Sequence, residues 1–257
     1  MTATFSVAAV ADCADRSTAW QVAHVSAPSE WNELDASGRK LVHESGTLQG
    51  VELSVGLRCG DWNWQAQLSQ LDGSRLYDGQ TSIGVPVASH SALRQRQGHL
   101  QASVDVTESW QLGGRLSAQR LWRDIASAGG ASGYPERYDW TLISLGAQWQ
   151  TALGPGQLTL AAWAGTQLTS RLVVNLPGRD SASLPLGSIK QVELAAGWRT
   201  QLSPAWHVQA DVGYRRTDME QGADGVIRRS GVPVGVAHQP RTSMVDRPIA
   251  IRLGYMF

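Results

Sequence analysis

Two short triplets place a histidine two residues before a serine: His24 with Ser26, and His43 with Ser45. Residues two apart in a β-strand project from the same face, so each histidine can serve as the base that activates its serine. The activated serine would be a nucleophile that could cleave an ester. Such a nucleophile also needs a group that orients the base, and the sequence identifies none. The alternative is a polar strand tip with no chemistry.

Nine charged residues fall on the polar faces of alternating segments, where they can meet inside a barrel. Arginine binds carboxylates through two parallel hydrogen bonds, so these residues are expected to form a cross-lumen salt-bridge network. The alternative is a narrow conduit or ligand cleft. The predicted network consists of Glu52, Arg58, Asp105, Arg115, Glu193, Arg199, Asp211, Arg215 and Arg252.

No other chemistry is indicated. The six histidines are scattered, and none pairs with a second histidine or a cysteine at ligand spacing, so no metal site is expected. No glycine-rich phosphate loop follows a strand and opens a helix, and we expect no cofactor. The 22 basic and 22 acidic residues balance, which argues against nucleic acid as a partner.

Hydrophobic residues alternate along nearly the whole chain. Every second residue is apolar from Trp206 to Tyr214 and from Val192 to Trp198, with mostly polar or small residues between them. This period of two is the signature of strands with one apolar and one polar face. Ten strands are expected, over 18–34, 39–58, 61–79, 92–106, 109–123, 135–151, 156–174, 186–202, 205–219 and 246–257.

The connections between these strands alternate in length. Turns such as 59–60, 107–109 and 153–156 are short, whereas the stretches 80–92 and 220–246 are long and polar. This pattern predicts an all-β fold, a ten-stranded antiparallel up-and-down barrel with short periplasmic turns and longer extracellular loops. A soluble barrel of lipocalin type alternates in the same way, so periodicity alone leaves open which face points outward.

Composition narrows the choice. Only 17% of residues are charged, against about 25% in typical soluble domains, and 20 of the 22 basic residues are arginine. No run approaches 18 apolar residues, which excludes a helical membrane protein but permits a membrane barrel, since half of its strand residues face the lumen.

Aromatic residues gather next to the short turns, which indicates a membrane-interface girdle with outward-pointing rings. A second ring is expected near the long loops. The alternative is a set of core tryptophans in a soluble domain. The first girdle comprises Trp62, Trp64, Trp110, Trp149, Trp206, Tyr255 and Phe257. The second comprises Trp31, Tyr77, Trp122, Tyr138 and Trp140.

The chain ends in Phe257, with Tyr255 two residues before it and apolar residues at every second position back to Ile249. This strand resembles the C-terminal strand of bacterial outer-membrane β-barrel proteins, although Arg252 stands where one version of that signal has glycine. The resemblance implies a porin-like barrel in the outer membrane of a Gram-negative bacterium, with loops at the cell surface. It also implies three partners: outer-membrane lipid, lipopolysaccharide and, through the last strand, the barrel assembly machinery.

In its ten strands the chain is similar in architecture to the omptin proteases, which use an Asp pair facing an Asp-x-His pair. The sequence contains neither Asp-x-Asp nor Asp-x-His, so the omptin mechanism has no residues to act through. Outer-membrane lipid hydrolases resemble one another in a His-x-Ser pair, which His43 and Ser45 match. The favoured interpretation is a non-enzymatic barrel with surface loops for binding or interaction and a lumen plugged by charged side chains. A lipid hydrolase and a small-solute conduit remain as alternatives.

Residues 1–17 are expected to form an N-terminal periplasmic segment and residues 18–257 the barrel. The first residues carry no positive charge, so they do not read as a signal peptide. The two cysteines, Cys13 and Cys59, both fall on the periplasmic side, next to adjacent strand ends. An oxidising periplasm would let them form a disulfide. The alternative is that Cys59 is a lone thiol.

Overall fold

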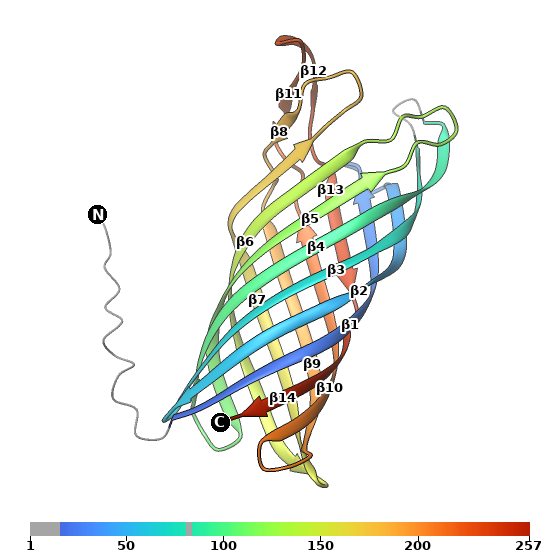
Figure 1. Ribbon diagram of the computed structural model, residues 1–257. Helices are drawn as coiled ribbons and strands as arrows, with labels where there is room; N and C mark the ends of the chain where they lie inside the picture. Colours follow the sequence, from blue (N-terminus) through green and yellow to red (C-terminus); the bar gives the residue numbers. More distant parts are fainter. Residues whose placement is uncertain (1–15, 81–83) are drawn as a thin grey trace, which may run out of the picture.

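A closed barrel of antiparallel strands makes up the computed structural model, which describes residues 16–80 and 84–257 (Figure 1). The ten-stranded all-β prediction is confirmed over these residues. The barrel strands are β1 Arg16–Leu34, β2 Lys40–Cys59, β3 Trp62–Gln80, β4 Pro86–Asp105, β5 Trp110–Ile125, β6 Pro135–Leu153, β7 Gly156–Val174, β9 Ile189–Gln201, β10 Trp206–Met219 and a last strand split into β13 Arg241–Asp246 and β14 Ile249–Met256.

The barrel closes between its first and last strands. Each barrel strand pairs with the next in sequence, and β1 pairs both with β2 and with β13 and β14. The last strand divides at Arg247 and Pro248, because proline has no N–H to donate to a ladder. Its carbonyl still accepts a hydrogen bond from the N–H of Gly213, at 2.8 Å, so the seam continues past the break.

Some element bounds differ from expectation. The fourth strand begins at Pro86 rather than at residue 92, and the first strand begins at Arg16, inside the segment assigned to the N-terminal tail. The stretch 220–246 is not one long loop. It holds the hairpin of β11 Gly225–Arg229 and β12 Val232–Ala237, then β13, while the short β8 Ala182–Leu184 pairs with β7.

Short and long connections lie at opposite ends of the barrel, with the C-terminus at the short-turn end (Figure 1). Gly60 and Gly154 sit in two of the tight turns with φ of 57° and 59°, a region that favours glycine. No helix in residues 16–80 and 84–257 is long and apolar enough to cross a membrane.

An apolar band surrounds the half of the barrel next to the short turns. On β5 the band begins at Trp110, beside the short turn, and continues along the strand through Leu112 and Leu116. All three side chains are well exposed, and the band ends at Arg120. The ten residue steps from Trp110 to Arg120 cover about 33 Å of strand, or about 25 Å along the membrane normal at a tilt of about 40°. That height matches the apolar band of outer-membrane barrels.

Beyond this band, towards the long loops, the polar and apolar faces of the strands change sides. Near the short turns the inward residues are polar, as with Gln101 and Ser117, whereas towards the long loops Leu71, Leu93 and Leu121 point inward and are buried. Apolar side chains therefore fill part of the lumen towards the long loops. Beyond the membrane the outer face meets water and headgroups, so apolar side chains are more stable inside.

Candidate functional site

Most of the nine predicted lumen charges find partners across the barrel. Arg115 lies 2.9 Å from Glu193 and 4.2 Å above the ring of Trp163. Arg252 contacts both Glu52 and Asp211. Three charged residues thus meet between β2, β10 and β14, which neutralises charge that would be costly to bury alone.

The remaining four predicted charges have partners of three kinds. Arg58 and Asp105 pair at 2.6 Å beside the short turns, where Arg58 is half exposed. Arg199 donates to the side-chain oxygen of Gln157 at 2.7 Å, a neutral partner. Arg215 binds Asp246 at 2.8 Å, a carboxylate absent from the predicted set.

A polar cavity of about 390 Å³ lies in the lumen, in the half of the barrel that the apolar band surrounds. Its walls carry ten glutamines, together with His99, Arg115 and Arg252. Because glutamine both donates and accepts hydrogen bonds, the lining can bind water or a small, uncharged polar solute.

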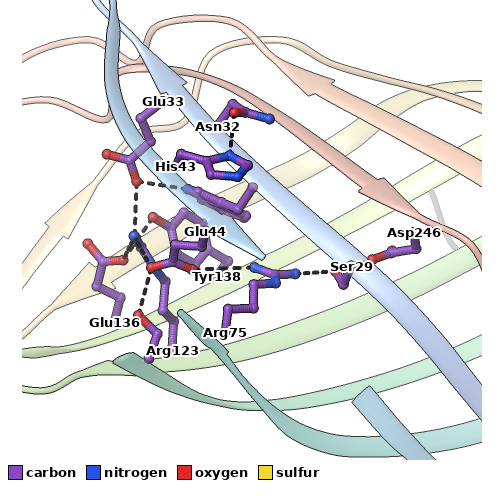
Figure 2. Close-up of polar contacts among 12 residues, drawn as sticks. Ser29, Asn32, Glu33, His43, Glu44, Arg75, Arg123, Glu136, Tyr138 and Asp246 are labelled. Atoms are coloured by element: carbon purple, nitrogen blue, oxygen red, sulfur yellow. Dashed lines mark hydrogen bonds and ion pairs between the residues drawn. The ribbon is translucent and has the colours of Figure 1, made fainter. Parts of the chain in front are cut away.

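A second cluster, which the sequence analysis missed, is buried inside the barrel towards the long loops (Figure 2). At its centre the Arg123 side chain is only 2% exposed. Its guanidinium binds Glu44 at 2.7 Å, Glu33 at 2.9 Å and Glu136 at 2.7 Å. These four side chains come from β1, β2, β5 and β6, so one arginine ties together strands on different sides of the lumen. We call Arg75, Arg123, Glu33, Glu44 and Glu136 the upper cluster.

A chain of hydrogen bonds links this cluster to the lower network. Arg75, fully buried, lies 3.7 Å from Glu44 and donates to the hydroxyl of Ser29 at 2.6 Å. Ser29 in turn donates to Asp246 (Figure 2), and Asp246 accepts from Arg215. Polar contacts therefore continue from the upper cluster down to the cavity wall, which Arg215 lines.

The expectation of a second outward aromatic ring is wrong for most of its members. Trp31, Tyr138 and Trp140 are buried inside the barrel, and the Tyr77 ring lies 6.0 Å from the Arg123 guanidinium. Trp31 and Tyr138 contact edge to face at 5.2 Å, and Arg123 lies 5.1 Å from the Trp31 ring. The reversal of polarity explains the error, since apolar residues point inward at this height.

The first aromatic girdle lies at the short-turn end. Trp62, Trp64, Trp110, Trp206 and Phe257 are exposed on the outer face, and Trp149 is half-buried opposite Trp110. Trp20, not in the predicted set, joins them 6.3 Å from the ring of Tyr255.

Cys59, at the end of β2, is disulfide-bonded. Its predicted partner Cys13 lies outside the described residues, so the pairing stays a prediction.

The candidate catalytic pair occupies the outer face of β2. His43 and Ser45 lie on the same face as Val51 and Leu53, in the part of the strand nearer the long loops. The structure adds the orienting group that the sequence did not reveal: the Asn32 side-chain oxygen lies 2.9 Å from Nδ1 of His43 (Figure 2). Asn32 stands directly opposite His43 in the β1–β2 ladder. An amide in this position selects one histidine tautomer and leaves Nε2 free to act as a base.

The missed residues share one signal. On β3, every second residue from Gln67 to Arg75 faces the lumen. The same holds on β5 from Arg115 to Arg123. Extending the alternation to the strand tips would have placed both missed arginines in the lumen. No sequence signal pairs them with Glu33, Glu44 and Glu136, because those contacts depend on barrel closure.

Comparisons with known proteins agree with this geometry. No family model and no curated protein matches the chain. Among solved structures, the outer membrane protease OmpT from Escherichia coli is similar over 95% of this chain and 97% of its own, at 10% identity and a TM-score of 0.58. The chain has the fold of a bacterial outer-membrane β-barrel, with the architecture of an omptin.

More distant matches are of the same kind. The translocator domain of the autotransporter NalP from Neisseria meningitidis matches 93% of this chain and 88% of its own, at 13% identity and a TM-score of 0.47. The P. putida toluene transporter TodX matches 93% and 89%, at 11% identity and 0.33. The omptin-like fold and the outward apolar band place the protein in the bacterial outer membrane.

Proposed function

We propose that this chain is a closed outer-membrane barrel that does not conduct solutes and acts at the cell surface. The observation that carries the proposal is the upper cluster: Arg123, buried inside the barrel, bonds to carboxylates from three other strands. Leu48, Leu71 and Leu121 are buried at neighbouring positions. Together these groups would close the lumen above the polar cavity, in keeping with the small interior of barrels far below the 16 strands of open porins.

The extracellular end offers a surface for binding. The β11–β12 hairpin stands beyond the barrel rim (Figure 1) and exposes Val226, Val232, Val234 and Val236. Asp180, from the neighbouring loop, accepts hydrogen bonds from the backbone N–H groups of two residues in the hairpin turn, at 3.0 and 2.8 Å. An anchored hairpin with exposed apolar side chains is suited to contact a partner or a surface.

Conductance measurements in planar bilayers test the closed lumen. The purified wild-type barrel is expected to give no stable current steps, and proteoliposomes containing it are expected to exclude small sugars. Steady single-channel conductance of the wild type would instead support a small-solute conduit.

Changing Val232 and Val234 to serine tests the surface role, since adherence of expressing cells to polystyrene should then fall to that of cells without the barrel.

A second candidate function is lipid ester hydrolysis, and the Asn32–His43 hydrogen bond is the observation that favours it. Asn32 would orient His43, His43 would take the proton from Ser45, and the serine oxygen would attack an acyl ester at the outer leaflet. The ester C–O bond would break, His43 would give the proton to the departing lipid alcohol, and water would then hydrolyse the acyl-serine to fatty acid. Labelled phospholipid and lipopolysaccharide provide the assay. Ser45→Ala should abolish any release of fatty acid, while Ser26→Ala is the matched control because it removes the serine of the other triplet. Full activity of the Ser45→Ala variant would eliminate this candidate.

A further inference from the structure

The polar cavity of the lumen has no part in the proposed surface function. Its volume of about 390 Å³ falls within the range of about 300–1,000 Å³ that small-molecule sites occupy. Polar side chains from strands all around the barrel line it, so a solute inside would be surrounded by hydrogen-bonding groups.

The cavity is closed at one end and open at the other. Leu71 and Gln95 face each other in the β3–β4 ladder, line the end towards the long loops and are buried. At the opposite end Gln157 is the second residue of β7, directly after a short turn, and its ladder partner Arg199 is exposed. Short turns face the periplasm in outer-membrane barrels, so the cavity opens to the periplasm.

The charges inside the cavity are already paired. Glu193 bonds to Arg115 at 2.9 Å, and Glu52 and Asp211 both bond to Arg252. Arg199 bonds to a neutral glutamine, but it lies at the opening, where water solvates it. A charged solute deeper in the cavity would have to break one of these pairs or lie without a counter-charge.

The glutamines, in contrast, carry hydrogen-bonding groups that the barrel does not use. Within residues 16–80 and 84–257, the side chains of Gln65 and Gln95 form no hydrogen bond. Gln97 and Gln148 each accept a hydrogen bond through the side-chain oxygen, which leaves their NH₂ groups as donors. A primary amide presents a donor and an acceptor side by side, so it can bond to two adjacent hydroxyl groups of one solute.

His99 adds a further group without a partner. It lines the cavity opposite Gln67 in the β3–β4 ladder, and only 8% of the residue is exposed. Its Nδ1 atom is buried and has no hydrogen-bond partner in the described part of the chain. Because an unsatisfied buried nitrogen costs free energy, this atom indicates a polar group of a solute or of water in the cavity.

We propose that the polar cavity binds an uncharged sugar of one or two rings, which enters from the periplasmic end. Sugar hydroxyls donate and accept hydrogen bonds, as do the free amides of Gln65 and Gln95, and another hydroxyl would satisfy Nδ1 of His99. The paired charges would hold the walls in place without attracting ions. The proposal rests on the closed lumen only for the side of entry, and sugar binding itself does not depend on it.

Equilibrium dialysis of the full chain in detergent tests binding with radiolabelled glucose, maltose and glucuronate. Glucose and glucuronate share a ring and differ in one carboxylate. Glucose and maltose should bind, and glucuronate should bind about tenfold more weakly than glucose because its charge finds no free partner.

Substitutions locate the site. Gln65→Leu and His99→Phe should each weaken maltose binding about tenfold, since each removes hydrogen bonds to the sugar. The matched control is Gln49→Leu, which makes the same change at an exposed glutamine outside the cavity and should bind maltose like the wild type.

Three outcomes would overturn the proposal. If neither glucose nor maltose bound to the wild type, the cavity would hold only water. Equal or tighter binding of glucuronate would contradict a site for uncharged sugars, and an equal loss in Gln49→Leu would show that the effect is not local to the cavity. The wild type alone decides the first two points, even if a variant does not fold.

The side of entry is tested after folding. Gln157→Cys places a thiol at the opening, and coupling it to a maleimide that carries polyethylene glycol should abolish the maltose binding seen in the uncoupled variant. If the coupled protein still bound maltose, the sugar would enter from the long-loop end. That result would refute periplasmic entry and the closed lumen, whereas sugar binding would stand.

Discussion

Replacing Arg123 with methionine is expected to destabilise the barrel strongly. The change keeps much of the aliphatic volume but removes a guanidinium that bonds to Glu33, Glu44 and Glu136 at 2.7 to 2.9 Å. Three carboxylates then face each other in a buried site. Breaking a buried ion pair in this way costs about 3–5 kcal/mol, and loss of the stacking on Trp31 adds to the effect.

Urea unfolding in lipid vesicles, followed by tryptophan fluorescence, measures the free energy of unfolding of the variant. The control is Arg216→Met, which removes an exposed pair with Asp218 and should cost less than about 1 kcal/mol. Adding Glu44→Gln to the Arg123→Met variant should recover part of the loss, because one uncompensated charge is removed. If Arg123→Met proved no more destabilising than Arg216→Met, the upper cluster would not stabilise the fold as argued.

Three further expectations concern the membrane and the periplasm. Leu116→Arg, on the lipid face, should cost about 2–4 kcal/mol in the same unfolding assay, while Gln65→Arg, on the lumen face at the wall of the polar cavity, should cost less; equal costs would contradict the assignment of faces. Deleting Phe257 should reduce the amount inserted in the outer membrane more than a charged substitution in a long loop, and normal levels on an immunoblot would count against it. A Cys13–Cys59 disulfide should appear in non-reducing mass spectrometry and contribute about 2–4 kcal/mol, whereas two free thiols in outer-membrane material would refute it.

The barrel itself could be predicted from the sequence. Alternation of apolar residues from Trp206 to Tyr214 and in the other strands reflects a local rule, since neighbouring side chains of a strand point to opposite faces. The short turns and the aromatic residues beside them, such as Trp110, are also local in sequence. Strand number, strand direction and the end of the barrel at which the turns lie could therefore be inferred without coordinates.

Local patterns could not show where the outward face changes from apolar to charged. Trp122 points outward and Tyr138 inward, although both were expected in the same ring, because their directions depend on strand phase and on height above the membrane. The break at Pro248 and the early start of β13 likewise depend on pairing with β1 and β10, which are distant in sequence.

The sequence by itself determined the strands, their alternation and the chemistry available on each face. Only the closed barrel decided which of those groups meet. Arg123 and Glu33 are 90 positions apart in the chain, yet they bond at 2.9 Å because the barrel brings β1 and β5 around one lumen. Asn32 came beside His43, and Arg120 beside Asp139, for a different reason, because each pair lies on two adjacent strands. Hydrogen-bond register fixes such lateral neighbours, and register is a property of the pairing rather than of either strand alone.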